Sequence, residues 1–144
     1  MTALDLICQF EGFRAEAYPD SAGYFTIGFG SRFWNDQPVS PSYPGTITEA
    51  EAMAQMAPEV VSLQNEITTA CMPQILTDSQ LTALTSFAYN VGFDAFRGST
   101  LHRFILAGNM TGAAGQFVLW DKADGEVVQG LLDRRIKERD IFLS

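Results

Sequence analysis

The stretch EGFRAEAYPDSAGYFTIGFG, residues 11–30, decides how this sequence is interpreted. Aromatic and β-branched residues occur in it beside Pro, Asp, Ser and Gly, which is typical of short strands joined by turns. We predict a turn at Pro19–Gly23 and a strand through Tyr24–Gly28, within a small antiparallel sheet over residues 13–34.

The segment before this stretch predicts a short helix. Apolar side chains recur near helical spacing over residues 3–11, and Gly12 is a common stop signal. Glu11 then lies in the last turn of the helix, Asp20 in the turn and Thr26 in the strand that follows. Because Glu11 and Asp20 lie on different elements, we expect them to approach a cleft from two sides.

The rest of the chain predicts a loop followed by helices. Residues 35–47 contain three prolines and are expected to form a loop, and from Thr48 the pattern is helical to the end. Thr48-x-x-Glu51 is a capping box that starts a long helix, which Pro58 should bend. Later helix signals are a capping box at Thr77-x-x-Gln80 with a stop at Gly92, N-caps at Ser99 and Thr111, and a last helix from about 128–131 toward Phe142.

These elements predict an α+β fold in one domain over residues 1–144. A small antiparallel sheet lobe, about 13–47, is expected to be joined by a long helix to a larger helical lobe. That lobe is expected to contain residues of about 72–144 plus the N-terminal helix 2–12. Two lobes joined in this way leave a cleft between them, which suits an extended polymer.

Composition excludes several classes of partner. Nine Lys and Arg against 17 Asp and Glu give a formal net charge of −8, so we expect no attraction to nucleic acid or anionic lipid. The single histidine, His102, and the cysteines Cys8 and Cys71 form no metal-binding motif, so we expect no metal and no cofactor. We interpret both cysteines as reduced core thiols, with a disulfide or a redox switch as the alternatives.

The N-terminal segment has the pattern of neither a secretion signal nor a membrane span. Its apolar run is short, lacks a basic leading region and is interrupted by Asp5 and Glu11. No stretch approaches the roughly 18 consecutive apolar residues that a span needs. We therefore expect the protein to be made in and confined to the cytoplasm, without membrane insertion, until another component releases it.

Paired carboxylates are the groups that cleave glycosidic bonds. One carboxylic acid protonates the leaving oxygen, and a carboxylate on the other side of the sugar activates water or attacks directly. Glu11 and Asp20 are of the right type, and the Thr26 hydroxyl is placed to hold a water beside Asp20. Taken singly, each residue has an ordinary alternative as a solvated helix-end acid, a turn former or a β-branched strand residue.

The segments FEGFRAEAYPD and GYFTIGFG resemble the catalytic stretch of the phage-type lysozymes, glycoside hydrolase family 24, with the signature Glu-x8-Asp-x5-Thr. Glu11, Asp20 and Thr26 match this signature without a gap. The resemblance continues, in the family's order, through LTALTSFAYNVG (81–92), AFRGSTL (95–101) and GLLDRR (130–135). It covers nearly the whole chain.

The resemblance implies a lysozyme-like fold and a muramidase that cuts the β-1,4 bond between N-acetylmuramic acid and N-acetylglucosamine in peptidoglycan. It implies that Glu11 is the general acid and that Asp20, with Thr26, positions water on the opposite face. Inversion at the anomeric carbon would require carboxyl groups roughly 6.5–9.5 Å apart.

The resemblance also implies residues that surround the reacting groups. Arg134, or else Arg135, would approach Glu11 from the helical lobe; the alternative is that both are surface arginines, with Arg134 pairing Glu138 at helical spacing. Candidates for the sugar-binding wall are Tyr89, Ser99, Gln116 and, more weakly, Asn90. Each of these can equally serve in packing or capping.

One position departs from the family pattern. The family often has His after the second glycine of the hairpin, where this chain has Ser31 followed by Arg32. The change bears on the local cleft geometry and the pH profile and leaves the reacting groups in place.

Two other functions stay open. A lytic transglycosylase of the same fold would not need the water-positioning Asp20, and a non-catalytic module would only bind the wall. The presence of Asp20 and Thr26 favours hydrolysis. As a bacteriophage endolysin, the protein would be a monomer that stays in the host cytoplasm until a holin releases it to the periplasm and cell wall, where it causes lysis.

Overall fold

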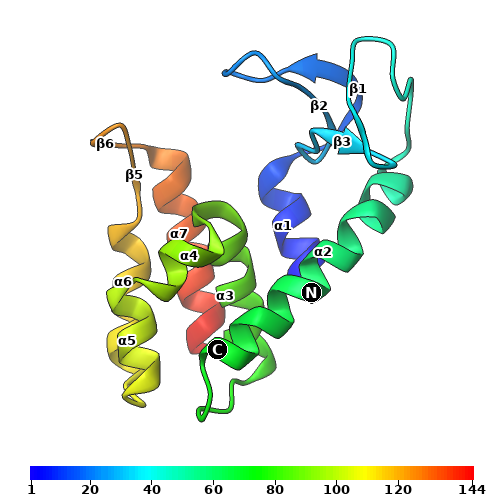
Figure 1. The fold of residues 1–144 in the computed structure, drawn as a ribbon. Coiled ribbons are helices and arrows are strands. Elements are labelled where there is room, and N and C mark those ends of the chain that lie inside the picture. Colours follow the sequence, from blue (N-terminus) through cyan, green and yellow to red (C-terminus); the bar gives the residue numbers. More distant parts are fainter. The chain divides into compact units, whose positions relative to one another are not determined.

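The computed structural model describes all residues, Met1–Ser144. Contacts within the chain divide it into two compact units, one of residues 3–59 with Met1 and one of residues 60–144 with Thr2. Figure 1 labels most of the elements, which in order are α1 (Ala3–Glu11), β1 (Arg14–Pro19), β2 (Phe25–Gly28), β3 (Phe33–Trp34), β4 (Gln37–Pro38), α2 (Glu49–Ala70), α3 (Asp78–Val91), α4 (Phe93–Arg97), α5 (Thr100–Leu106), α6 (Met110–Gln116), the 3-10 helix η1 (Phe117–Leu119), β5 (Lys122–Ala123), β6 (Glu126–Val127) and α7 (Gln129–Leu143).

Helix α1 buries one face and ends at a glycine. Ala3, Leu6 and Ile7 are buried. Gly12 has a φ of +72° and donates its N–H to the Cys8 carbonyl, which is the kind of helix end that favours glycine. The predicted helix over residues 3–11 is confirmed.

The structure groups α1 with the first unit, whereas we predict from the sequence that residues 2–12 join the helical lobe. Asp5 and Cys8 of α1 line one pocket together with Glu49 and Met53 from the first turns of α2. Because α1 faces this N-terminal part of α2, its neighbours belong to the segment that ends at Glu59.

Strands β1 and β2 form the predicted antiparallel hairpin. Tyr18 pairs with Thr26, and the register shifts between Arg14 and Tyr18, as it does at a β-bulge. Gly28 at the end of β2 has a φ of +67°, and a Cβ there would lie 3.0 Å from Cβ of Ala52 in α2. Glycine is therefore required where this hairpin approaches the first turns of α2.

A second small hairpin follows, and it corrects our prediction that residues 35–47 are only a loop. β3 pairs with β4, and the two residues between them, Asn35 and Asp36, have φ values of +49° and +63°. Such a two-residue turn with positive φ at both positions fits the twist of the flanking strands. Three prolines suggested a loop, but Pro38 is accommodated at the end of a two-residue strand.

Helix α2 begins at the predicted capping box. Glu51 N–H donates to Thr48 Oγ1 at 3.1 Å, and Thr48 N–H donates to Glu51 Oε1 at 2.9 Å. The helix contains Pro58 and continues to Ala70, so it begins in the first unit and ends in the second.

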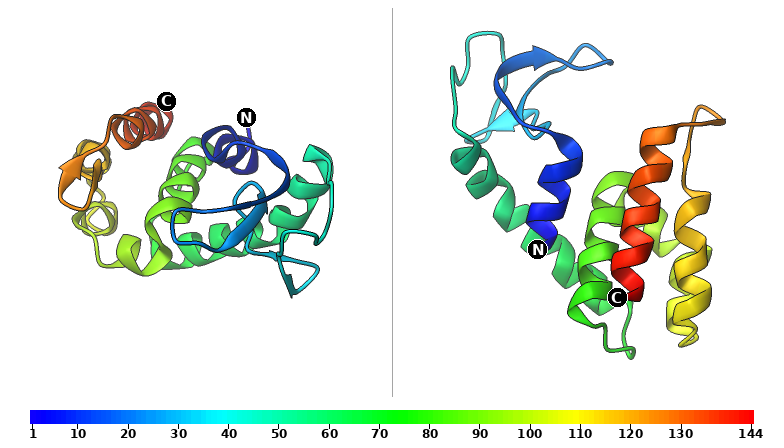
Figure 2. Two further views of the ribbon diagram at one scale, coloured as in Figure 1. Left: turned by 90° about the horizontal axis from the view of Figure 1, so that it is seen from above. Right: turned by 180° about the vertical axis from the view of Figure 1, so that it is seen from behind.

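The second unit has an aromatic core built on α3. This helix has the predicted capping box at Thr77 and ends before Gly92. Its Phe87 is fully buried and lies edge-on to Phe117 and Trp120, with ring centroids 5.3 and 5.4 Å away. Helix α7, which spans the residues predicted for the last helix, packs along α3 (Figure 2, right).

His102 of α5 joins the end of α2 to the end of α4. Its Nδ1 lies 3.0 Å from the Arg97 carbonyl oxygen and its Nε2 lies 2.7 Å from the Ala70 carbonyl oxygen. The predicted N-cap of α5, Ser99, is confirmed, because its hydroxyl accepts the N–H of His102 at 3.1 Å. The short helix α4 between Gly92 and Ser99 carries no cap signal of its own.

Two predictions for the second unit are wrong. Asn109, not Thr111, is the N-cap of α6, because its Oδ1 accepts the N–H of Gly112 at 2.8 Å. The segment is also not helical to the end, since β5 and β6 form a hairpin with Asp124 and Gly125 at its turn, where φ is +51° and +79°. The Asp-Gly pair is a hairpin signal that the helical periodicity of the flanking segments obscured.

Both cysteines are buried and free, so the predicted reduced thiols are confirmed. None of the helices combines the length and the apolar character needed to cross a lipid bilayer.

Candidate functional site

Glu11, Asp20 and Thr26 all lie in the first unit. Glu11 is the last residue of α1 and is exposed, with the left-handed Gly12 immediately after it. The helix therefore ends at the residue predicted to be the acid, as the sequence indicated.

Asp20 follows β1 and is held by the turn that it starts. Its Oδ1 accepts the backbone N–H groups of Ala22 and Tyr24, each at 2.9 Å. The Asp20 N–H donates to the Tyr24 carbonyl at 2.7 Å, and the Gly23 N–H donates to the Asp20 carbonyl at 3.0 Å. The first two bonds hold Oδ1 and the two backbone bonds close the turn, while the Asp20 side chain keeps 24% of its surface exposed.

Thr26 is the second residue of β2 and is almost fully buried, with 3% of its surface exposed. It lies opposite Tyr18, and its hydroxyl donates to the Tyr18 carbonyl at 3.5 Å. The pairing brings Thr26 to the end of β1, two residues from Asp20.

Arg32 is a neighbour of Asp20 that the sequence did not reveal. Its Nη2 lies 3.3 Å from Asp20 Oδ2, and its guanidinium lies over the Tyr24 ring, 4.1 Å from the centroid. Ser31, the residue that departs from the family pattern, exchanges two backbone hydrogen bonds with Ile27, each 2.9 Å long. This bridge folds residue 32 back toward the hairpin, a contact that no local sequence signal predicts.

The arginines of the GLLDRR block lie in the second unit and are buried, not at the surface. Arg134 Nε lies 3.2 Å from Glu138 Oε2, which confirms the pairing at helical spacing that we considered for it. Its Nη2 also donates to the Ser86 carbonyl of α3 at 3.0 Å. Arg135 is fully buried, lies 2.8 Å from Glu138 Oε1 and donates to Asn90 Oδ1.

Glu138 is the centre of a cluster that we call the α3–α7 network and define as Ser86, Asn90, Arg134, Arg135 and Glu138. All of these residues except the exposed Asn90 are buried. Ser86 Oγ donates to Glu138 Oε2 at 2.5 Å. Burial raises the pKa of the Glu138 carboxyl, and the guanidinium of Arg135, followed by Ser86 and Arg134, acts against this rise. The approach of Arg134 to Glu11 stays a prediction.

The candidates for the sugar-binding wall also lie in the second unit. Tyr89 is half-buried near the end of α3, and Gln116 is half-buried at the end of α6. The Ser99 hydroxyl donates to the Phe96 carbonyl at 2.6 Å and accepts the His102 N–H, so the helix cap uses its donor and one of its two acceptor positions. Sugar binding by these side chains stays a prediction.

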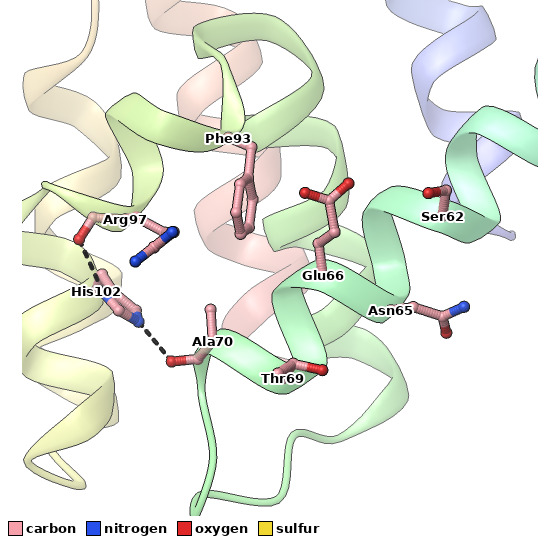
Figure 3. A pocket seen from close by; sticks show the side chains of 8 residues that line it. All are labelled: Ser62, Asn65, Glu66, Thr69, Ala70, Phe93, Arg97 and His102. Atoms are coloured by element: carbon pink, nitrogen blue, oxygen red, sulfur yellow. Dashed lines mark hydrogen bonds between the residues drawn. The ribbon is translucent and has the colours of Figure 1, made fainter.

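One pocket of the second unit contains none of these predicted residues. It has a volume of about 610 Å³ and is bordered by α2, α4 and α5 (Figure 3). Its lining residues are Ser62, Asn65, Glu66, Thr69, Ala70, Phe93, Arg97 and His102. Residues 1–144 contain no group of three or more His, Cys, Asp or Glu side chains placed to hold a metal ion.

Comparison with known proteins gives one family and many relatives. The family model described as phage lysozyme matches residues 8–138. The endolysin of Bacillus phage B103 is 38% identical over 143 residues, which cover 98% of this chain and 52% of that protein. The endolysin of Salmonella phage P22 is 37% identical over 134 residues, which cover 93% of this chain and 90% of that protein.

A solved structure of another phage endolysin is also similar to this chain. The endolysin from Escherichia coli O157:H7 phage FAHEc1 superposes with a TM-score of 0.88 at 34% identity, covering 99% of this chain and 90% of the other. The chain spans about half the length of the endolysins of Bacillus phages B103 and PZA, so similarity to them concerns one half of those proteins.

Proposed function

We propose, because this chain belongs to the phage lysozyme family, that it is an endolysin-type muramidase. Its reaction is hydrolysis of the β-1,4 bond between N-acetylmuramic acid and N-acetylglucosamine in peptidoglycan, with residues 1–144 acting as one lysozyme domain. The observation that carries this proposal is the family match over residues 8–138, which includes Glu11, Asp20 and Thr26.

Glu11 is the general acid in this proposal. It donates a proton to the glycosidic oxygen while the bond from that oxygen to the anomeric carbon breaks. Its side chain is exposed at the helix end, where solvent and a substrate reach the carboxyl group.

Asp20 is the base that accepts a proton from the attacking water. Two backbone N–H groups hold its Oδ1, so little reorganisation is needed when substrate binds. The Thr26 hydroxyl donates to a carbonyl, which leaves its oxygen lone pairs to accept a hydrogen bond from the same water. The water oxygen then bonds to the anomeric carbon on the face opposite the leaving group.

Residues of the second unit complete the proposed site. Arg134 supports Glu11, and its fixed place in the α3–α7 network suits that role. Tyr89 and Gln116 bind sugar by stacking and hydrogen bonding. Ser99 binds sugar through the acceptor position of its hydroxyl that the helix cap leaves.

The biological setting follows from the same family membership. The relatives' printed names are endolysins, so we propose a monomer whose partner is the glycan strand of peptidoglycan. It stays in the host cytoplasm until a holin releases it to the periplasm and wall, where cleavage lyses the cell. The net charge of −8 argues against long-range electrostatic attraction as the means of docking to an anionic wall.

Product analysis of digested peptidoglycan tests this proposal. Mass spectrometry should find fragments with reducing N-acetylmuramic acid ends, and NMR of the fresh product should show inverted anomeric configuration. Anhydro-muramic ends would instead identify a lytic transglycosylase. Binding to the wall without any released fragment would identify a non-catalytic module.

A further inference from the structure

Asp20 has four acceptor positions, and the structure accounts for three of them. A carboxylate offers about two lone-pair sites on each oxygen. The Ala22 and Tyr24 N–H groups fill those of Oδ1, and the Arg32 guanidinium occupies one side of Oδ2. One acceptor position on Oδ2 remains for a water molecule.

Arg32 is itself held in place. Its guanidinium lies 4.1 Å from the centre of the Tyr24 ring, and the backbone N–H of the same Tyr24 donates to Asp20. A planar guanidinium stacks on an aromatic ring while its edge hydrogen-bonds to a carboxylate, which an ammonium group does less well. Tyr24 therefore supports Asp20 directly through its backbone and indirectly through Arg32.

We propose that Arg32 is a positioning residue: by holding Oδ2, it turns the remaining acceptor position of Asp20 toward the attacking water. The inference rests on the proposed role of Asp20 and extends it to a residue next to Ser31, where this chain departs from the family pattern. Without Arg32, only Oδ1 is held, and the carboxylate rotates and samples directions in which Oδ2 does not meet the water.

The size of the effect is limited by solvent. The Arg32 side chain is 51% exposed and that of Asp20 is 24% exposed, so salt and water weaken their attraction. We expect Arg32→Ala to lower kcat about threefold to fivefold, which corresponds to the upper range for an exposed charged pair. KM stays within about twofold, because Arg32 acts on Asp20 and not on the substrate.

Arg14 provides a matched control. It is also an exposed arginine of the same unit that lies over a tyrosine ring, 4.3 Å from the centre of Tyr18, and no carboxylate pairs with it. Arg14→Ala should leave kcat within twofold of the wild type. Arg32→Lys keeps the positive charge and should have a kcat between those of Arg32→Ala and the wild type.

The experiment combines kinetics on a soluble peptidoglycan fragment with NMR of the free protein. The ratio of wild-type to Arg32→Ala kcat should shrink as salt is raised from 0.05 to about 0.5 M, because the Debye length falls well below 10 Å. The ¹³C signal of the Asp20 carboxylate should shift in Arg32→Ala and stay in place in Arg14→Ala.

The results separate this inference from the proposed function. A wild-type protein that releases no fragments overturns the proposed function, while an unchanged Asp20 signal in Arg32→Ala overturns the contact itself. In an active protein, the positioning role is wrong if Arg32→Ala raises KM and spares kcat, if it increases kcat, or if Arg32→Lys is no better than Arg32→Ala.

Discussion

Among single residues, Glu11 is the one whose replacement tests the proposed reaction most directly. Glu11→Gln keeps the size of the side chain and removes the proton that is given to the leaving oxygen. General acid catalysis contributes about 10²–10⁴-fold, so we expect a loss of that order in the clearing of permeabilised Gram-negative cells. The thermal midpoint of the variant, measured beside its activity, shows whether the loss occurs in a folded protein.

Glu16→Gln is the control for this change. Glu16 is an exposed acid of β1 in the same unit, and its Oε1 accepts only a long hydrogen bond of 3.4 Å from Thr46. Glu16→Gln should clear cells as fast as the wild type. Wild-type clearing by Glu11→Gln would assign the acid to another residue.

Asp20 is tested with two substitutions, because its side chain both takes part in the proposed reaction and holds the turn. Asp20→Ala removes the acceptor of the Ala22 and Tyr24 N–H groups, whereas Asp20→Asn keeps an oxygen there and replaces Oδ2, the partner of Arg32, by an uncharged NH2 group. Both variants should lose activity by orders of magnitude, since neither accepts the proton of water. Amide exchange at Tyr24 should be faster in Asp20→Ala only. Full activity in Asp20→Asn would contradict water activation and favour transglycosylation.

For single residues, the sequence predicts those positions that depend on neighbours in the chain. Glu11 at a helix end and Asp20 in a turn follow from the neighbouring Gly12 and from the Pro, Ser and Gly around Asp20. The contact of Arg32 with Asp20 joins residues 12 positions apart and depends on a backbone bridge between Ile27 and Ser31. No periodicity carries that information.

Between elements, the α3–α7 network is the feature with the largest expected effect on stability. Glu138 is fully buried and faces the guanidinium groups of Arg134 and Arg135. Glu138→Ala leaves these charges without their carboxylate, and breaking a buried pair in this way costs about 3–5 kcal/mol. We expect this decrease in the free energy of unfolding in urea.

Asp140→Asn is a control on the same helix. Asp140 pairs with Arg139 at 2.9 Å, but its side chain is 60% exposed. The loss of such a surface pair costs about 0–1 kcal/mol. If Glu138→Ala is as stable as Asp140→Asn, the buried Glu138 does not stabilise the fold more than an exposed acid does.

The ends of helices and strands are also predicted where the cause is local and missed where it is not. The capping boxes at Thr48 and Thr77 predict two helix starts because each bond joins residues three apart. Thr111 fails as a cap because Asn109 lies earlier in the same segment and accepts the N–H of Gly112. The hairpin at Asp124 was missed because strands of two residues have no measurable alternation.

For the whole molecule, the two buried thiols give one reporter in each unit. Burial raises the pKa of Cys71 to about 11, and burial together with the charges of Asp5, Glu49 and Glu11 raises that of Cys8 to about 11. The ordinary value is 9.0, so both thiols stay protonated and unreactive in the native protein at pH 8. Since these pKa values are raised by folding, the associated stability is complete below pH 9 and is lost between about pH 9 and 11.

Labelling of these thiols tests whether residues 1–144 unfold as one domain. Cys8→Ala leaves Cys71 as the reporter of the second unit, and Cys71→Ala leaves Cys8 as the reporter of the first. Because α2 begins in one unit and ends in the other, and helices form cooperatively, we expect both thiols to react with a disulfide reagent at pH 8 with the same urea midpoint. Circular dichroism of each variant supplies its global midpoint as the control. A thiol that becomes reactive well below that midpoint would mean that its unit opens alone, and the single-domain proposal would then be wrong.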